Sequence, residues 1–290
     1  MRGFYHIAGI RRAKVYSPHN EDNDEAIFLE VLKCLEALGH EVRVYDESDL
    51  LADVVEESYI YNMVRSQEAV AKLQVLEQNG VVVVNSGFGI EHCGREQMTT
   101  LLMNNGVPFA PSEIVNLDKI VNCQLSIVNH PCWVKRADGY TVESSDVVFV
   151  NEASQLQQVL DGFVQRGIHR VVVSQHLEGD LVKFYGVADT DFFYWFYPLA
   201  SNHSKFGYEM VNGTPVGIPF SEDRLKDICI QASEVLGVEV YGGDAIVSKD
   251  GTIRLIDFND WPSFAPYREE AAKAIAQVII QKIEKYEAGR

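Results

Sequence analysis

Basic residues are scarce in this sequence, which has 25 Lys and Arg against 42 Asp and Glu over 290 residues. The formal net charge of −17 argues against a nucleic-acid backbone or an anionic membrane as the general partner, because both repel an acidic surface. Any anionic ligand must therefore be held by local cations. The sequence also lacks an apolar targeting segment and any apolar run of membrane-spanning length. We expect a protein that works without nucleic acid or membrane.

Cysteines are also few and irregularly spaced. The five cysteines are Cys34, Cys93, Cys123, Cys132 and Cys229, and no two form a Cys-x-x-Cys pair. This number and spacing indicate neither a disulfide framework nor a zinc site, and reduced thiols fit a cytoplasmic protein. The hydrophobic content of 47% and the charged content of 23% are those of an ordinary soluble globular protein.

The N-terminal third of the chain alternates between strand and helix patterns. Short apolar runs indicate strands, and apolar residues at helical spacing indicate helices that end at glycine or at asparagine-glycine. The predicted strands are 4–10, 41–45 and 81–84, and the predicted helices are 24–38, 66–78 and 95–104. This alternation predicts a small parallel sheet covered on both faces by helices.

From Pro108 onward the pattern changes to shorter strands and hairpins. The predicted strands are 132–135, 145–150, 171–176, 182–188, 192–197, 238–241, 244–248 and 252–257. The predicted helices are 153–165, 223–236 and 267–286. We therefore expect three lobes, at residues 1–107, 108–174 and 175–290.

The polar end of the last predicted strand is the most informative segment. Side chains alternate along a strand, so Asp257 and Asn259 point to one face while Phe258 points to the other. Two oxygen donors at this spacing suit Mg²⁺, which takes few protein ligands and completes its shell with water and phosphate. Asp244, one hairpin upstream, could supply a third oxygen. Polar residues that are merely solvated at a strand end would give the same pattern.

A lysine follows an apolar strand in the middle of the chain. Lys135 ends the run Pro131–Lys135 and precedes a turn that contains Gly139. A lysine beside a flexible glycine turn can reach a nucleotide phosphate as a point charge. The polar run 143–145 continues a loop that could fold over phosphates. A surface lysine before a turn is the alternative interpretation.

Further along the chain, an apolar strand passes into a polar connector over residues 171–180. Backbone groups of Ser174 and Leu177 could pair with the edge of an adenine ring, and an acid just beyond them could accept ribose hydroxyls. Asp180 is the first candidate for that acid and Glu178 the second. An acidic hairpin turn explains the same residues equally well.

Two further groups of cations could hold an anionic substrate. Arg11, Arg12 and Lys14 follow the first predicted strand and form a local basic cluster in an otherwise acidic protein. Lys183 lies on the strand after the connector, where it could meet a phosphate or an anionic substrate. A solvated loop is an equally good interpretation of the first cluster.

These motifs follow one another in an order that resembles the ATP-grasp superfamily. The matching segments are Lys135 with Gly139, residues 175–180, Gly243-Asp244 and residues 257–262. Upstream, residues 84–86, 95–98 and 106–108 resemble the segment before the grasp domain in glutathione-synthetase-like members. The N-terminal strand-helix pattern agrees with the usual first domain of that family.

The resemblance implies an α/β (α+β) ATP-grasp fold with an N-terminal parallel α/β domain, a small lid subdomain and a C-terminal antiparallel-sheet lobe. ATP would lie between the lid and the C-terminal lobe with one or two Mg²⁺ ions, or Mn²⁺ in their place. The implied nucleotide contacts are Lys135 and Arg95 to phosphates, Ser174, Gln175 and Leu177 to adenine, and Asp180 or Glu178 to ribose. The implied metal ligands are Asp244, Asp257 and Asn259. Arg95 departs from the lysine of many relatives, and Asp257 from the glutamate of most ligases.

Most members of the superfamily join a carboxylate to an amine through an acylphosphate, so the resemblance implies a ligase with a small carboxylate or other anionic substrate. Lys183, Arg11 and Arg12 would then act on that substrate. A kinase is the alternative, because these cations are similar to those of inositol-phosphate kinases with the same fold. Those kinases have a histidine-glycine pair where this chain has Asp138-Gly139. A non-catalytic ATP-binding regulatory protein is the third option, and a homodimer stays open because relatives often dimerise.

Overall fold

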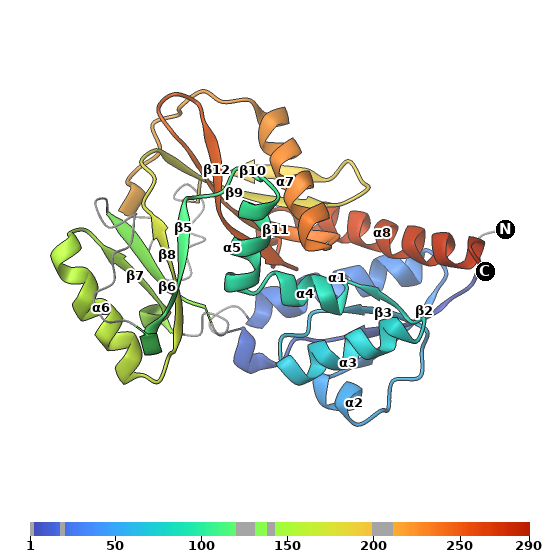
Figure 1. The fold of residues 1–290 in the computed structure, drawn as a ribbon. Helices are drawn as coiled ribbons and strands as arrows, with labels where there is room; N and C mark the ends of the chain where they lie inside the picture. The colour runs from blue at the N-terminus through green and yellow to red at the C-terminus, as the bar shows by residue number, and fades with distance from the viewer. Residues whose placement is uncertain (1–2, 18–20, 120–130, 138–142, 199–210) are drawn as a thin grey trace.

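A computed structural model describes residues 3–17, 21–119, 131–137, 143–198 and 211–290 of the chain (Figure 1). Within these residues the strands form three four-stranded sheets that follow one another along the sequence. The first sheet is parallel and the other two are antiparallel. The predicted α/β class with this division of sheets is confirmed. No helix in the described ranges is both long and apolar enough to cross a membrane.

The N-terminal sheet has the strand order β2-β1-β3-β4. Its elements are β1 (His6–Ile10), η1 (Lys14–Tyr16), α1 (Glu21–Ala37), β2 (Glu41–Tyr45), α2 (Glu47–Leu51), β3 (Tyr59–Asn62), α3 (Gln67–Gln78), β4 (Val82–Val84) and α4 (Gly87–His92). Strand β1 is buried on both faces: Ile7 belongs to the core beneath α1 and the C-terminal helix, whereas Ala8 and Ile10 belong to the core beneath α2 and α3. Helices therefore cover both faces, as predicted (Figure 1).

Three elements of this region, β3, α2 and α4, are absent from the sequence-based prediction. Strand β3 is four residues long and ends in Asn62, so it has no long apolar run. It forms because β1 and β4 pair with it on its two sides. The Asn62 amide then donates to the carbonyls of Val84 and Asn85 at 3.3 and 2.9 Å. Pairing with neighbouring strands, and not local sequence propensity, therefore determines that this segment forms a strand.

The second sheet has the strand order β5-β8-β6-β7. Its elements are β5 (Ser112–Asn116), η2 (Leu117–Lys119), β6 (Cys132–Arg136), η3 (Ser144–Asp146), β7 (Val147–Val150), α6 (Ala153–Gln165) and β8 (Arg170–Gln175). Helix α6 buries Leu156, Leu160 and Phe163 against the sheet, because these residues recur at helical spacing on one face. The other face of the sheet is left to border the rest of the molecule (Figure 1).

The third sheet has the strand order β10-β9-β11-β12. Its elements are β9 (Asp180–Val187), β10 (Phe193–Phe196), α7 (Glu222–Leu236), β11 (Val240–Val247), β12 (Ile253–Asp260) and η6 (Ala265–Tyr267). Strand β11 is continuous, whereas the sequence predicts a break at Gly242-Gly243. These glycines let the neighbouring strands approach closely. A Cβ on Gly243 would lie 2.3 Å from the carbonyl oxygen of Asp257.

Two helices tie the lobes together. Helix α5 (Arg95–Asn104) precedes the predicted division at residue 107, yet Met98 and Leu102 share a hydrophobic core with α7 and the third sheet. Helix α8 (Arg268–Ala288) ends the chain but lies beside α1 over the N-terminal sheet (Figure 1). The boundary expected at 107 lies between β4 and β5, the one expected at 174 lies inside β8, and both helices pack beyond the stretch to which these boundaries assign them.

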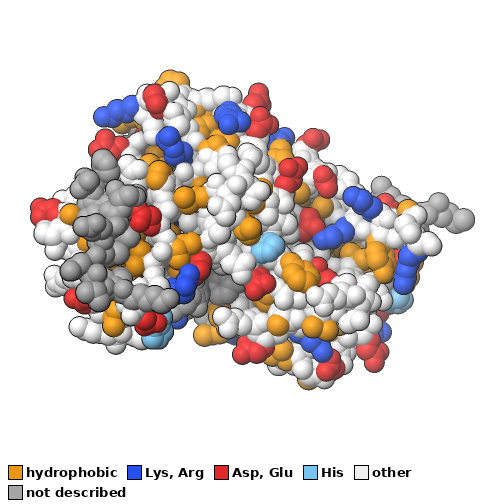
Figure 2. Space-filling view, in the orientation of Figure 1, with side chains coloured by type: hydrophobic (Ala, Val, Ile, Leu, Met, Phe, Trp, Pro, Cys, Tyr) orange, Lys and Arg blue, Asp and Glu red, His pale blue; other side chains and the backbone are white. Residues whose placement is uncertain are grey.

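Charges of both signs are spread over the surface. On the face shown in Figure 2, acidic and basic side chains are scattered among one another instead of gathering by sign. Cationic and acidic side chains do converge in the interior, in the cavity between the sheets.

Candidate nucleotide and metal site

A cavity of about 440 Å³ lies between the second and third sheets and is lined by their side chains and by residues that follow strands of the first sheet, such as Arg12 and Arg65. Part of it is charged, and another part is mostly apolar and aromatic. The charged part contains Lys135, Arg95, Lys183, Asp244, Asp257 and Asn259. The structure therefore brings to one cavity the candidate phosphate cations and the candidate metal ligands, which are far apart in sequence.

The end of β12 places its polar residues through an irregularity in the strand. Asp244 pairs with Asp257, but the next residue of β11 pairs with Leu255, so Ile256 is an extra residue in β12. Because of this bulge, Ile256 and Asp257 both line the cavity, and Phe258 turns into the core with no exposed surface. Asn259 faces the cavity again and donates from Nδ2 to Asp257 Oδ2 at 3.1 Å. Asp257 and Asn259 thus share a face opposite Phe258, as predicted.

A row of charged residues crosses the third sheet beside this pair. Lys183 of β9 is in register with Asp244 of β11, which is in register with Asp257 of β12. Residues in register on neighbouring strands present their side chains on the same face. Lys183 Nζ lies 3.0 Å from Asp244 Oδ1. The row therefore runs from a cation to a first and then a second carboxylate.

Lys135 enters the same place from the second sheet. Its Nζ donates to the Ile256 carbonyl at 3.1 Å, which puts the ammonium next to Asp257 along the chain. Burial lowers the pKa of Lys135 to about 8, although the carboxylates of Asp257 and Asp244 act in the opposite direction. The nearby Arg95 lowers this pKa further. Gly139, expected in the turn after Lys135, lies outside the described residues.

Arg95 is the first residue of α5 and contacts the second sheet. Its Nη1 donates to the Arg136 carbonyl at 2.8 Å. Burial lowers the pKa of the guanidinium, and the carboxylates of Asp257 and Asp146 oppose that shift. Lys135 and Arg95 therefore bring two buried cations toward one carboxylate, Asp257, from two different elements.

The oxygen donors of the charged part fit a magnesium ion. Asp244, Asp257 and Asn259 supply two carboxylates and one amide. The described residues contain no group of three His, Cys, Asp or Glu side chains that could hold a metal by themselves. A cation here would therefore need the amide and oxygens from a ligand or water. That requirement matches Mg²⁺, which usually keeps few protein ligands.

The apolar part of the cavity is formed by Trp133, His176, Val147, Leu181 and Ile246. Trp133 Nε1 donates to His176 Nδ1 at 3.2 Å, so this ring nitrogen acts as an acceptor. Burial lowers the pKa of His176, which favours the neutral ring. Flat rings and aliphatic side chains of this kind suit a planar heterocycle. Trp133 and His176 are absent from the candidate nucleotide contacts, although both flank segments that are among them.

The residues expected to contact adenine do line this part. Ser174, Gln175 and Leu177 all face the cavity. The Ser174 hydroxyl accepts a hydrogen bond from Ser112 at 2.8 Å. The carbonyl of Leu177 accepts one from Asn212 Nδ2 at 2.9 Å. Part of the hydrogen-bonding capacity of this connector is therefore already used within the protein.

Asp180 and Glu178 are placed differently from the expectation, because the described residues that line the cavity include neither. The Asp180 side chain is buried, and its carboxylate accepts backbone N–H groups from Val216, Gly217 and Ile218 at 2.9, 2.8 and 2.8 Å. Its charge therefore holds a neighbouring loop in place. The expectation that Asp180 meets a ribose is corrected accordingly.

The cluster after the first strand also differs from the expectation. Arg11 forms an ion pair with Glu25 at 3.1 Å and lies over the Phe28 ring, outside the described lining of the cavity. Arg12 does line the cavity, but its Nη1 donates to Asp24 at 2.8 Å. Burial and the neighbouring Arg65 lower the pKa of Arg12. The two arginines do not form one anion-binding patch.

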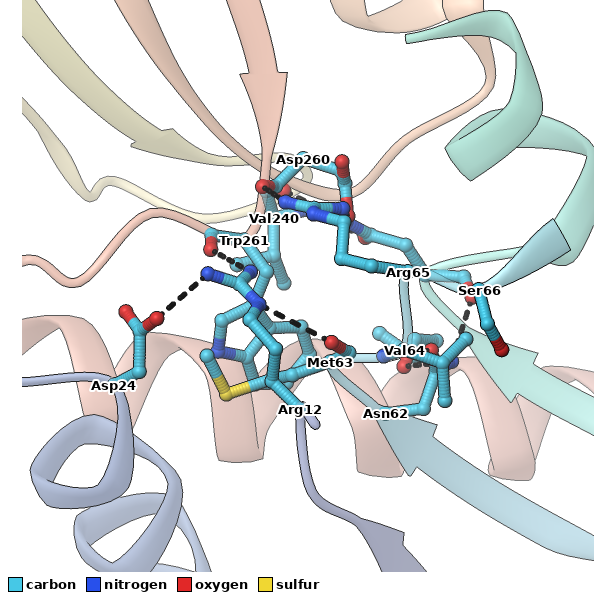
Figure 3. Close-up of polar contacts among 12 residues, drawn as sticks. Arg12, Asp24, Asn62, Met63, Val64, Arg65, Ser66, Val240, Asp260 and Trp261 are labelled. Atoms are coloured by element: carbon cyan, nitrogen blue, oxygen red, sulfur yellow. Dashed lines mark hydrogen bonds and ion pairs between the residues drawn. The ribbon is translucent and has the colours of Figure 1, made fainter. Parts of the chain in front are cut away.

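Arg65 and Asp260 are cavity residues that sequence reasoning missed. Arg65 forms a buried ion pair with Asp260, and its Nη2 donates to the Asp260 carbonyl at 2.8 Å (Figure 3). The two residues are 195 positions apart, so no local pattern links them. The one available signal is that Asp260 directly follows Asn259 in the polar end of β12.

Comparison with known protein families finds no match to this sequence, and no curated protein matches it. Solved structures do resemble it along its whole length. D-alanine–D-alanine ligase from Bacillus anthracis, in a crystal structure complexed with ATP, is 13% identical with a TM-score of 0.69, over 99% of this chain and 100% of that one. D-alanine–D-alanine ligase from Coxiella burnetii is 13% identical with a TM-score of 0.68, over 98% and 97%. At this identity the likeness establishes the fold alone.

Proposed function

We propose that this chain, which has the ATP-grasp fold of those ligases, is an ATP-dependent ligase that joins a carboxylate to an amine. The observation that carries the proposal is the convergence of Lys135 and Arg95 with Asp257, Asn259 and Asp244 in one cavity. Buried cations beside hard oxygen donors suit a magnesium-bound triphosphate. The fold adds support, because one solved example is complexed with ATP.

The two parts of the cavity suggest how the nucleotide lies. The base would occupy the slot beside Trp133 and His176, and the phosphates would extend toward Lys135 and Arg95. Asp257, Asn259 and Asp244 would hold Mg²⁺, or Mn²⁺ in its place, and the bound metal would neutralise phosphate charge. The protein's part is to bind and orient the triphosphate and to keep water away from it.

The reaction has two balanced steps. A carboxylate oxygen of the substrate bonds to the γ-phosphorus, and the bond from that phosphorus to the β–γ bridging oxygen breaks, releasing ADP. The amine nitrogen then bonds to the acyl carbon, phosphate leaves with the electrons of the carbon–oxygen bond, and the nitrogen loses a proton. Neither step needs a covalent protein intermediate, so the residues act by position and charge. Lys183, which lines the cavity beside Asp244, would neutralise charge on the transferred phosphoryl group.

The kinase alternative is less well supported by the same geometry. A phosphorylated polyol substrate needs several cations that are not already neutralised. Arg11 is paired with Glu25 away from the cavity, and two of the three arginines that line the cavity, Arg12 and Arg65, each face an aspartate. A substrate of low net charge fits this arrangement better.

Trapping of the acylphosphate tests the proposal. The full-length protein is incubated with ATP, Mg²⁺ and pools of carboxylates, with and without amines, and ADP and phosphate are measured. Hydroxylamine should capture the activated acyl group as a hydroxamate whenever ATP and the right carboxylate are both present. Amine-dependent release of ADP together with phosphate supports a ligase. ADP release with a phosphorylated acceptor and no free phosphate would indicate a kinase, and nucleotide binding without turnover in any pool would contradict the ligase.

A further inference from the structure

Two arginines of the N-terminal domain hold the polar end of β12 (Figure 3). Arg65, just after β3, contacts both the carboxylate and the carbonyl of Asp260. Arg12, just after β1, donates from Nη2 to the Trp261 carbonyl at 2.9 Å. The residues held in this way directly follow Asn259. The N-terminal domain therefore reaches the strand that carries the candidate metal ligands.

The end of β12 has little support from its own sheet. Among the described strands of the third sheet, β12 pairs with β11 alone. On its other side Leu255 makes backbone hydrogen bonds to Pro108 and Ala110 at 2.8 Å, and this pairing stops before Asp257. The bulge at Ile256 interrupts the pairing of β12 with β11 just before Asp257. A bulged strand end that is paired on one side can shift or twist where nothing else fixes it. The contacts from Arg65 supply a second anchor on the far side of Asn259.

Other contacts hold the backbone at Arg65 in place. The Glu47 carboxylate accepts the backbone N–H of Arg65 at 3.0 Å and the hydroxyl of Ser66 at 2.6 Å. The side chains of Arg65 and Asp260 are 9% and 3% exposed, so the ion pair is shielded from water. A charge-assisted contact in such surroundings is strong and strongly directional. The pair can therefore fix the position of the strand end to within a narrow range.

We propose that Arg65 is a positioning residue for the metal site: through Asp260 it fixes the end of β12, and so sets where Asp257 and Asn259 present their oxygens. Magnesium-dependent nucleotide binding then requires the N-terminal domain. This inference rests on the proposed function, because it assumes that a magnesium nucleotide binds here.

The test compares nucleotide affinity with and without the metal. Calorimetry measures binding of a non-hydrolysable ATP analogue to the full-length protein in Mg²⁺ and, separately, in EDTA. In the wild-type protein Mg²⁺ should strengthen binding. Arg65→Met should reduce that enhancement at least tenfold. Its affinity in EDTA should stay within about twofold of wild type, since only the metal ligands are displaced. Arg65→Lys keeps one charged contact and should give an intermediate value.

Lys282→Met is the matched control. Lys282 also joins the two domains, because its Nζ donates to the Val83 carbonyl at 2.9 Å and pairs with Glu239. Neither partner lies in the cavity lining among the described residues. This variant should lower the thermal midpoint and keep the full magnesium enhancement. Loss of the enhancement in Lys282→Met would show that any weakening of the domain contact suffices, and would overturn a specific role for Arg65.

Asp260→Asn provides a second route if Arg65→Met fails to fold. It keeps the shape of the side chain and removes its charge, so it should also reduce the enhancement. The double variant Arg65→Met/Asp260→Asn should lose no more enhancement than Arg65→Met alone, because Arg65 acts through Asp260. Equal loss of affinity in Mg²⁺ and in EDTA, or no loss in either, would overturn the inference. A wild-type protein without magnesium enhancement would instead refute the proposed function, and this inference with it.

Discussion

The cations of the loop after β1, Arg11 and Arg12, differ from the second-sheet cation Lys135 in how far neighbouring groups already balance their charge. Arg11 and Arg12 each form an ion pair with a carboxylate of α1, Glu25 and Asp24. Lys135 makes a hydrogen bond to a backbone carbonyl and has no ion pair within the described residues. All three are candidates for anion binding from the sequence. The difference indicates that a buried cation without an ion pair is a stronger candidate for a ligand site than one already paired with a carboxylate.

Burial acts differently on the two regions for the same reason. A buried ion pair offsets the loss of hydration, at least in part, by the attraction between its members. Lys135 has no ion pair within the described residues, and the attraction of Asp257 and Asp244 offsets burial only in part, so its pKa falls to about 8. A phosphate ligand would restore the missing partner. Lys135 therefore gains more from a bound anion than Arg11 or Arg12.

Replacement of Asp257 gives the largest expected effect on this comparison. Asp257→Ala removes the carboxylate toward which Lys135 and Arg95 converge, and with it one metal ligand. We expect turnover with Mg²⁺ to fall on the order of a thousandfold while the fold is kept. ADP release and a thermal melt measure the two quantities. Asp250→Ala, in the turn before β12, is the control, because Asp250 lies outside the cavity lining. Normal turnover in Asp257→Ala would remove the metal assignment.

Lys183 tests a cation that is paired and yet lines the cavity. Lys183→Met leaves Asp244 without its described ion-pair partner and removes a positive charge from the row across the third sheet. We expect kcat to fall on the order of a hundredfold, because charge on the transferred phosphoryl group loses a neutralising partner. The KM for ATP should change much less. Steady-state kinetics separates the two, and Lys183→Arg should recover part of kcat. An unchanged kcat would assign Lys183 to structure alone.

The pH dependence of nucleotide binding tests the unmatched charge of Lys135. Its pKa of about 8 means that the free protein loses this charge as the pH rises above 8. An anion binds the protonated lysine better, so affinity should fall about tenfold between pH 7 and pH 9.

The lowered pKa of Lys135 has the opposite effect on the stability of the ligand-free fold. Between pH 8 and 10.5 the unfolded chain binds more protons at this lysine, so this group makes folding more favourable as the pH rises.

Substitutions of this lysine separate its charge from its titration. The guanidinium of Lys135→Arg stays charged throughout this range, so that variant should bind nucleotide with little dependence on pH. Lys135→Met should bind more weakly and also without the dependence. Calorimetry at several pH values with a non-hydrolysable analogue gives the comparison. A wild-type affinity that is flat from pH 7 to 9 would show that Lys135 does not meet the phosphates.

Regular spacing made much of the fold predictable. Helices with apolar residues on one face, such as α6, and apolar strands such as β4 follow directly from the sequence. The placement of Asp257 and Asn259 on one face follows from strand alternation, and a bulge at Ile256 does not disturb it because it precedes both residues. These features depend on neighbours in sequence.

The features that could not be predicted depend on partners far away in sequence. Asp180 looks like a ribose acid, but three backbone N–H groups of residues 216–218 take its carboxylate. Arg65 has no motif, and its role comes from a strand end 195 residues later. The Gly242-Gly243 pair falls in a gap between two predicted strands, whereas close packing against β12 makes it part of one continuous strand. Only the assembled fold shows which polar groups are already satisfied.

Arg11 gives the smallest expected effect and tests the comparison from the other side. Its pair with Glu25 is partly exposed, with side chains 37% and 45% accessible, so removal should change the free energy of unfolding by less than about 1 kcal/mol. Turnover of Arg11→Ala should stay within about twofold of wild type, because the described cavity lining does not include Arg11. Glu25→Ala removes the other member of the pair and should behave alike. A strong loss of turnover in Arg11→Ala with an unchanged melt would show that a paired cation outside the cavity still serves the substrate, and the distinction between the two regions would fail.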